Sequence, residues 1–373
     1  MGIFIGVDVG GTTSTVCLGD AKGRLLEITP QFATRSDEGP AATIADIAAE
    51  IVRALGAHRR QLQDVKMVTI ATPGPATSEG VLLSTPNLKH ADWNNCPVRE
   101  LLETKLRAEA RQDPRVDATI DELAVRYLGD GQAAALGEFA VRRGDIQIRP
   151  ELASKYNIQI QSPEPELNSL FMVAVGTGLG GGEVRNREAV RGSEGRAGHA
   201  GHLMLPADAF RYPHDQELQV GNAFCTVESA VSLTALTHQL GYRLELEQWK
   251  DHALHQVAGT SKDRAKKLRE LAAAGDELAL ELFDDQATAL GIALLMIQYI
   301  GDYDELVIGG GVCDMTPKMR DRYLATVKAA FFQRALNGFR SFDSITFSHC
   351  GDQASVIGAY VDALVQTGAG SCV

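Results

Sequence analysis

Two glycine-rich clusters and one aspartate beside them have the composition of a site that binds an anion. In the first cluster, DVGGTT, Asp8 ends an apolar segment, and Gly10, Gly11 and Thr12 follow it. An unpaired buried carboxylate is costly, and carboxylate oxygens suit Mg²⁺ held through water. Glycines let a polyanion approach backbone N–H groups, and the Thr12 hydroxyl adds a donor. The alternative is an aspartate that only caps a glycine-rich hairpin.

The second cluster, GTGLGGG, contains Gly176, Thr177, Gly178 and Gly180 after another apolar run. It is not a Walker A loop, since no Gly-Lys-Ser/Thr follows, and it does not open an evident helix as a dinucleotide fingerprint does. We interpret it as a second phosphate-binding hairpin with Thr177 as a donor. A plain turn with bulges is the alternative.

A third glycine segment closes a predicted buried strand at Gly309, Gly310 and Gly311, in the motif IGGGV. Backbone without side chains can lie against the flat face of a base or ribose. The same glycines can equally serve a close crossing of a helix and a strand. Both interpretations stay open at the level of sequence.

Asp130 is the candidate catalytic residue. It opens the motif DGQAAALGE, whose small residues predict a tightly packed helix. A helix N-terminus favours a carboxylate, so an N-cap is the simple interpretation. The alternative is a general base that accepts the proton of a substrate hydroxyl, a role that contributes about 10²–10⁴-fold in rate.

Alternating strands and helices must position these residues. Ile3, Ile5 and Val7 alternate with other residues, which predicts a strand that enters a hairpin, and the segment before Gly176 repeats that plan. An amphipathic helix is predicted where Ile44 and Ile51 share a face. The pattern indicates the α/β class with two related halves. Residues 144–168, with three prolines and little periodicity, predict an irregular insertion.

Composition limits the function classes. A chain of 373 residues that is 45% hydrophobic predicts a globular protein of two domains. A net charge of −12 without a dense basic block argues against nucleic-acid binding. The six cysteines form no C-x-x-C pair, Asp8 interrupts the apolar start, and the longest apolar run is too short for a membrane span. We therefore expect a cytoplasmic protein with free thiols and no membrane association.

Eight motifs occur in a fixed order: DVGGT, TPNLKHADW, DGQAAALGE, GTGLGGG, GRAGHAGH, VESAVS, IGGGV and GDQASVIGAY. Together they resemble the ROK family of sugar kinases and repressors, within the actin-like ATPase superfamily. The resemblance extends from Gly2 to Ala363, apart from residues 144–168 and the stretch around residues 240–277.

The resemblance implies two actin-like (ribonuclease H-like) domains with an interdomain cleft that closes on a hexose and MgATP. The smaller N-terminal domain would comprise residues 1–128 and the larger one residues 129–351, with a C-terminal helix at about 352–373 packing back on the first. Domain closure would exclude water from phosphoryl transfer.

The resemblance also implies a role for each matching residue. Asp130 matches the catalytic base, Asn87 a sugar contact, His202 the histidine of a Glu-x-Gly-His motif, and Glu228 a ligand of sugar hydroxyls. The other matches are the first phosphate loop with its Mg²⁺-binding aspartate (Asp8, Gly10, Gly11, Thr12), the second phosphate loop (Gly176, Thr177, Gly178, Gly180) and the adenosine loop (Gly309, Gly310, Gly311).

Three departures from the family pattern concern the sugar. Gly129 stands before Asp130 where family kinases have asparagine, and His199 replaces the glutamate of Glu-x-Gly-His. An imidazole differs from a carboxylate in charge and hydrogen bonding, so glucose recognition is expected to change. The zinc motif C-x-C-G-x-x-G-C is absent, with Cys225 alone remaining near His202, which predicts no zinc. His202 is then a sugar ligand, the favoured interpretation, or a structural histidine.

The leading hypothesis is an ATP- and Mg²⁺-dependent kinase that phosphorylates a hydroxyl of a hexose or hexose derivative. Glucose, fructose and an N-acylhexosamine stay open as acceptors. The first alternative is a catalytically weak sugar- or nucleotide-binding sensor. The second is an actin-like phosphotransferase with a non-sugar partner, against which TPNLKHADW and Glu228 argue. No helix-turn-helix precedes the first strand, which disfavours a repressor, and family analogy predicts a homodimer.

Overall fold

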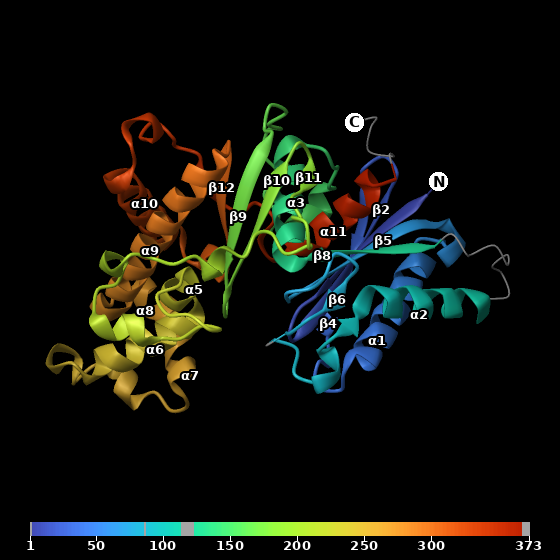
Figure 1. The fold of residues 1–373 in the computed structure, drawn as a ribbon. Coiled ribbons are helices and arrows are strands. Elements are labelled where there is room, and N and C mark those ends of the chain that lie inside the picture. The colour runs from blue at the N-terminus through green and yellow to red at the C-terminus, as the bar shows by residue number, and fades with distance from the viewer. Residues whose placement is uncertain (1, 86, 113–122, 368–373) are drawn as a thin grey trace. The chain divides into compact units, whose positions relative to one another are not determined.

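A computed structural model describes residues 2–85, 87–112 and 123–367 of the chain (Figure 1). Strands and helices alternate, as the sequence predicts for the α/β class. The chain forms two compact units: the first comprises residues 1–170, 182–198 and 349–373, and the second comprises residues 171–181 and 199–348.

The first sheet belongs to the first unit and has the strand order β3-β2-β1-β5-β8, with β4 paired to β2. Its strands are β1 (Ile3–Val9), β2 (Thr13–Asp20), β3 (Leu25–Ile28), β4 (Phe32–Ala33), β5 (Val65–Thr72) and β8 (Ala124–Gly129). Strands β1 and β2 form the predicted antiparallel hairpin, whereas β1, β5 and β8 run parallel. The carboxyl ends of these three parallel strands therefore lie at one edge of the sheet.

Helices of the first unit are α1 (Pro40–Ala57), α2 (Val98–Gln112), α3 (Asp130–Arg143), α4 (Pro150–Lys155) and α11 (Ala354–Val365), beside a small pair of β6 (Val81–Leu82) and β7 (Cys96–Pro97). Helices α1 and α2 lie side by side (Figure 1). The predicted apolar face of α1 is buried, with Ile44 and Ile51 at most 3% exposed. Removing this face from water is the main stabilisation of such a helix.

Helices α3 and α11 cross with their backbones in contact. A Cβ atom on Gly137 would lie 2.1 Å from the Ala354 carbonyl oxygen, and one on Gly358 would lie 1.7 Å from that of Ala133. This close packing groups α3 with the first unit (Figure 1). The two compact units therefore differ from the predicted domain limits, 1–128 and 129–351. Those limits describe two related halves of the fold, and they stay a prediction. Residues 368–373 of the predicted C-terminal helix lie outside the described residues.

Residues 144–168, predicted to be irregular, contain the short helix α4. The segment also pairs with β3: the Gln147 carbonyl accepts a hydrogen bond from the Leu25 N–H, at 3.0 Å. The Tyr156 hydroxyl donates to the Ile28 carbonyl at 2.5 Å. The sequence lacks the periodicity of a long element because these contacts, rather than an amphipathic face, hold the segment.

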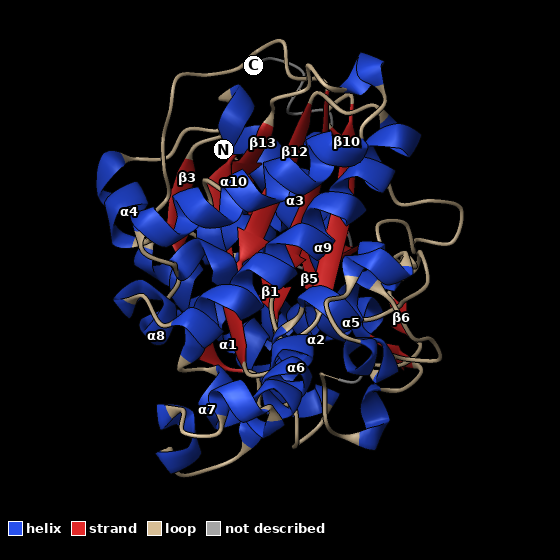
Figure 2. Cartoon of the chain, turned by 90° about the vertical axis from the view of Figure 1, so that its left-hand side faces the viewer, coloured by secondary structure: helices blue, strands red, loops and turns tan. Residues whose placement is uncertain are grey.

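A second sheet has the order β11-β10-β9-β12-β13. Its strands are β9 (Ser169–Val175), β10 (Leu179–Arg185), β11 (Glu188–Ala189), β12 (Glu305–Gly310) and β13 (Ile345–Phe347). The helices of the second unit are α5 (Val227–Val231), α6 (Leu233–Glu245), α7 (Ser261–Ala265), α8 (Leu268–Ala274), α9 (Glu277–Gly301) and α10 (Pro317–Arg334). Helices α9 and α10 run side by side and pack on strands β9 and β12 through one apolar core (Figures 1 and 2).

A buried arginine on α6 links this helix to α9 through ion pairs. The Arg243 side chain is fully buried and donates to both oxygens of Asp215, at 2.7 and 2.9 Å. It also pairs with Glu281 and Asp285 on α9, at 3.2 and 3.1 Å. Removal of the guanidinium would leave the buried Asp215 carboxylate without its cation.

Candidate functional site

The first glycine turn is closed by backbone and side-chain bonds. The Gly10 N–H donates to the Thr13 carbonyl at 2.9 Å. The Thr34 and Ser36 hydroxyls donate to the carbonyls of Gly10 and Gly11, at 2.8 and 2.9 Å. Neighbouring side chains thus satisfy both glycine carbonyls and fix the turn.

The predicted sugar contact Asn87 lies against this turn. A Cβ atom on Gly11 would come within 2.8 Å of the Asn87 carbonyl oxygen, so glycine is needed for the close approach. Asn87 and Thr12 are both exposed. The first unit therefore brings a predicted phosphate-binding turn and a predicted sugar contact together.

Asp8 ends the parallel part of β1 and is partly buried. Its Oδ1 accepts a hydrogen bond from the Ser355 hydroxyl at 2.7 Å. Burial raises the pKa of the Asp8 carboxyl to about 7, the negative charges of Asp130 and Asp352 add to the increase, and the bond from Ser355 opposes it. Asp8 and Asp130 are therefore near enough for their charges to interact, which follows from parallel strands ending at one edge.

Asp130 is the first residue of α3 and is exposed. The N-cap position belongs to Gly129, so the simple N-cap interpretation of Asp130 is not what the structure shows. The Gly131 N–H donates to the Asp130 Oδ1 at 2.7 Å, which orients the carboxylate at the helix N-terminus. Ligands of open α/β sheets bind at the carboxyl ends of parallel strands, where Asp130 stands after β8.

Gln132 lies in the motif DGQAAALGE, and the sequence alone predicts no role for it. Its buried amide accepts from the Gly129 N–H at 3.2 Å. The same amide donates to the carbonyls of Gly195 and Ala197, at 3.2 and 3.0 Å. A glutamine at the third helical position is a capping signal, but its partners in residues 191–198 are too distant in sequence to be foreseen.

The second glycine turn, in the second unit, is tied to the start of α6. The Leu233 N–H donates to the Gly176 carbonyl and the Thr234 hydroxyl to the Thr177 carbonyl, both at 2.9 Å. Gly176 and Thr177 are exposed, and a Cβ atom on Gly180 would meet no protein atom within 4 Å. Packing within the protein therefore does not explain why residue 180 is a glycine.

Glu228 lies directly behind this turn, in the first turn of α5. Its Oε2 accepts from the Leu179 N–H at 2.7 Å. Cβ atoms on Gly178 and Gly201 would approach the same oxygen to 2.7 and 3.3 Å, so both glycines make room for the carboxylate. A predicted phosphate turn and a predicted sugar ligand therefore meet in the second unit as well.

His199 and His202 flank Gly201 in the same unit, and both are exposed. Their rings are nearly parallel, with centroids 6.3 Å apart. The backbone after His202 pairs with the segment that leads into α5, since the Val227 N–H donates to the Leu203 carbonyl at 2.9 Å. This pairing brings the histidine turn beside Glu228.

The three glycines at the end of β12 differ in how closely other atoms pack against them. Gly310 has a φ of 81°, and a Cβ atom there would lie 2.3 Å from the Val175 carbonyl oxygen. A Cβ atom on Gly309 would clash with the Met172 Cε at 2.3 Å. Close packing against backbone therefore explains Gly310, whereas the atom nearest a Cβ atom on Gly309 is the end of the flexible Met172 side chain, which can shift. The nearest contact of a Cβ atom on Gly311 would be 3.7 Å away. Arg269 of α8 donates to the Gly311 carbonyl at 2.9 Å, a neighbour that the sequence did not signal.

Within the described residues, no group of three or more His, Cys, Asp or Glu side chains is placed to hold a metal ion. Cys225, the remaining cysteine of the predicted zinc region, has a φ of 53° and a sulfur 3.9 Å from the Gln216 carbonyl oxygen. No described helix is both long and apolar enough to span a bilayer.

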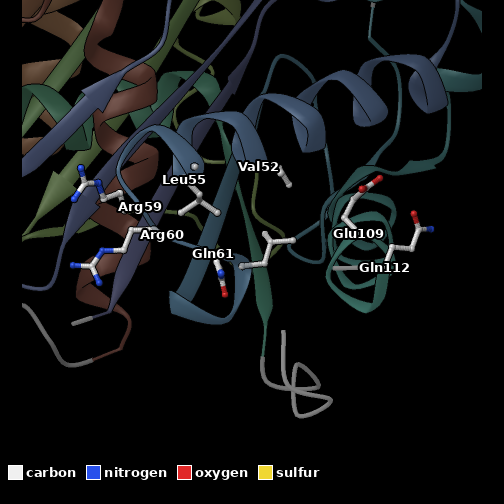
Figure 3. A pocket seen from close by; sticks show the side chains of 9 residues that line it. Val52, Leu55, Arg59, Arg60, Gln61, Glu109 and Gln112 are labelled. Carbon is white, nitrogen blue, oxygen red and sulfur yellow. The ribbon is translucent and has the colours of Figure 1, made fainter. Parts of the chain in front are cut away.

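A surface hollow at the ends of α1 and α2 is separate from the predicted site residues (Figure 3). Val52, Leu55 and Leu62 contribute apolar lining. Figure 3 shows the side chains of Arg59 and Arg60 directed away from Glu109. The hollow therefore does not gather its charged groups around one point.

The first unit contains a glycine turn and, at a helix N-terminus, Asp130, and the second unit contains another glycine turn. The ROK family model matches residues 4–136 and 153–367, so the chain belongs to the ROK family. The predicted resemblance and the actin-like α/β fold are confirmed.

Curated relatives of the chain are sugar kinases. A glucokinase of Halalkalibacterium halodurans is 25% identical over 95% of this chain and 93% of its own length. An N-acetylmannosamine kinase of Vibrio vulnificus is 24% identical over 87% of this chain and 86% of its own length.

Solved structures share the fold. A ROK hexokinase from Thermus thermophilus aligns with a TM-score of 0.71 at 23% identity, over 98% of this chain and 99% of its own. A ROK family glucokinase from Streptomyces griseus, solved in complex with glucose and AMPPNP, aligns with a TM-score of 0.67 at 24% identity, over 98% and 100%.

Proposed function

We propose that the protein is an ATP- and Mg²⁺-dependent sugar kinase that transfers the γ-phosphate to a hydroxyl of a hexose or hexose derivative. The observation that carries the proposal is the position of Asp130. Its carboxylate stands exposed at a helix N-terminus, after a parallel strand, and its charge interacts with that of Asp8. An aspartate in such a place can accept the proton of a hydroxyl as the phosphoryl group is transferred.

The residues present fit MgATP. Gly180 faces open space, the carbonyls of both glycine turns are satisfied by neighbours, and Asp8 supplies a carboxylate next to the first turn. We assign Asp8 to Mg²⁺ through water. We assign the nucleotide to the two turns and to the glycines at the end of β12 (Gly10, Gly11, Thr12, Gly176, Thr177, Gly178, Gly180, Gly309, Gly310, Gly311). Bound Mg²⁺ would neutralise charge on the phosphates. Gly311, where a Cβ atom would meet no protein atom closer than 3.7 Å, would lie nearest the nucleoside.

Asn87, His199, His202 and Glu228 are assigned to the sugar. One oxygen of Glu228 is committed to the Leu179 N–H, which leaves its second oxygen for a hydroxyl. His199 and His202 are exposed beside it. Imidazoles can donate or accept, so they suit a polyol but select it differently from a carboxylate. The relatives act on glucose and on N-acetylmannosamine, and both belong in the first substrate panel.

The test is an ADP-release assay on a panel of hexoses and N-acylhexosamines with the wild type, Asp130→Asn and Glu100→Gln. Glu100 is an exposed acid in the first turn of α2 and serves as the matched control. We expect Asp130→Asn to lower kcat by about 10²–10⁴-fold on the best sugar, because it removes the base. Turnover of Asp130→Asn within a few-fold of wild type would show that Asp130 is not the base.

A catalytically weak sugar or nucleotide sensor is the second candidate, and Gly129 and His199 favour it. Both stand where the family's kinases carry sugar-contacting residues. Thermal-shift titrations with MgATP and with each sugar distinguish the two functions, since a ligand of the folded state raises the melting temperature whether or not it reacts. A sensor would show these shifts without turnover. A homodimer, proposed on family analogy, requires a separate measurement of mass in solution.

A further inference from the structure

We propose that Gln132 is a positioning residue that sets the place of Asp130 and, through the same amide, of the chain segment that leads to His199. The inference rests on the proposed kinase function for its catalytic consequence. Its structural basis lies within the first unit and in the connectivity of the chain.

The Gln132 amide makes bonds on two sides at once. Its Oε1 accepts from the N–H of Gly129, the residue directly before Asp130, at 3.2 Å. Its Nε2 donates to the carbonyls of Gly195 and Ala197, at 3.2 and 3.0 Å. The residue is only 3% exposed, so solvent cannot replace these bonds without opening the structure.

The N-terminal turn of α3, which contains Gln132, also packs against strand β10. A Cβ atom on Gly182 of β10 would lie 2.1 Å from the Gly131 carbonyl oxygen and 2.8 Å from the Gln132 Cα. The first turn of α3 therefore has a strand against its backbone and a loop against its side chain. A turn packed in this way transmits a displacement of the loop to Asp130 rather than absorbing it.

The loop that Gln132 holds is anchored elsewhere too. Arg191 donates to the Ser78 carbonyl at 2.8 Å, and a Cβ atom on Gly195 would lie 3.0 Å from the Ser78 backbone. Gly195 has a φ of 79°, which fits a tight turn at this point. The stretch 182–198 of the first unit ends at Gly198, and the next residue, His199, belongs to the second unit. Gln132 thus connects the candidate base to the segment that enters the proposed sugar-binding histidines.

The test compares Gln132→Glu with Gln298→Glu. Gln298 is a matched control, because it is 2% exposed and its amide likewise accepts from the Tyr303 N–H and donates to the Tyr303 carbonyl, at 3.2 and 3.1 Å, at the end of α9. In each variant the carboxylate keeps an acceptor and loses a donor that faces carbonyl oxygens. Both changes remove the same kind of bond, so a general loss of folding stability should affect both.

We expect Gln132→Glu to lower kcat by about 10²-fold, since a misplaced catalytic group loses about that much, with the KM for ATP unchanged. The loss should shrink as the pH is lowered, because a protonated carboxyl regains one donor. Gln298→Glu should keep the wild-type kcat and pH profile. If Gln132→Glu retains kcat within about threefold, or if both variants lose activity only in proportion to their unfolded fraction, the positioning role is wrong.

Hydrogen–deuterium exchange gives a readout that does not depend on activity. Exchange of the peptide covering residues 191–198 should rise at least tenfold in Gln132→Glu and stay unchanged in Gln298→Glu. Should wild type show no kinase activity while this difference persists, the kinase function fails and the coupling by Gln132 stands. Should Gln132→Glu not fold, Gln132→Asn keeps the amide but shortens it by one methylene, and the same exchange increase and kcat loss are expected. Unchanged exchange in the folded variant would overturn the inference.

Discussion

The hydroxyl of Ser355 donates a 2.7 Å hydrogen bond to the carboxylate of Asp8, although 347 residues separate the two in sequence. Ser355 stands in the first turn of α11, and Asp8 stands near the carboxyl end of β1. The bond therefore joins the first motif of the chain to the last. A donor to the charged form lowers the pKa of an acid, whereas burial raises it, and the balance for Asp8 lies at about 7.

The raised pKa of Asp8 predicts how Asp8→Asn affects stability. The folded pKa of about 7 lies above the unfolded value of 3.8, so the contribution of Asp8 to the free energy of unfolding is fully present below about pH 4 and is lost as the pH rises through about 7. Asparagine does not ionise, so the variant should gain on the order of 1–3 kcal/mol over wild type at pH 8 and little at pH 4. Urea denaturation in EDTA measures the difference, and an equal difference at both pH values would contradict it.

Gly180→Ala should separate ligand binding from folding. A Cβ atom on Gly180 meets no protein atom within 4 Å, so the free energy of unfolding should change by less than about 0.5 kcal/mol. If phosphates approach this backbone, the added methyl should raise the KM for MgATP by about tenfold or more. Gly241→Ala is the control, since that site on α6 is also open and has no proposed ligand. Equal nucleotide affinity in both variants would remove Gly180 from the proposed site.

Arg243→Met should be among the most destabilising substitutions in the second unit. It leaves Asp215, Glu281 and Asp285 without their shared cation, and breaking a buried ion pair costs about 3–5 kcal/mol. Arg211→Met is the control, because Arg211 also pairs with Asp285 but its side chain is 45% exposed, and such pairs contribute about 1 kcal/mol or less. Urea titrations should rank the two variants in that order, and similar midpoints would contradict the assignment.

Restoring the family pattern should change sugar preference. The double variant Gly129→Asn/His199→Glu returns an amide and a carboxylate to the proposed sugar side. Gly129 has ordinary extended dihedral angles, and a Cβ atom there would have its nearest contact at 3.6 Å, so the backbone accepts a residue with a Cβ atom. We expect kcat/KM for glucose, relative to N-acetylmannosamine, to rise by about 10–100-fold, the effect of one or two hydrogen bonds to charged groups. Gly129→Ala/His199→Ala is the control, and an unchanged ratio would place the specificity elsewhere.

Local sequence patterns predict several features that the structure then shows. Alternating apolar residues predict the hairpin of β1 and β2, and the spacing of Ile44 and Ile51 predicts the buried face of α1. The order of the motifs predicts the family. These features depend on neighbouring residues or on short periodic spacing, so they can be predicted from the sequence alone.

Packing between distant segments decides what the sequence leaves open. Gly310 matches a nucleotide-binding motif, yet its close contact with the Val175 backbone explains the glycine, while Gly180 faces open space. Asp130 resembles an N-cap in sequence, yet Gly129 holds that position.

By itself, the sequence determined the class of fold, the family and the hairpin of β1 and β2. Only the tertiary structure decided that Ser355 partners Asp8 and that Gln132 binds the loop before His199. Each of these bonds joins segments that chain distance separates and folding brings together. The residues around either partner show no pattern from which the other could be predicted, because a single hydrogen bond involves one residue and produces no periodic spacing in the sequence.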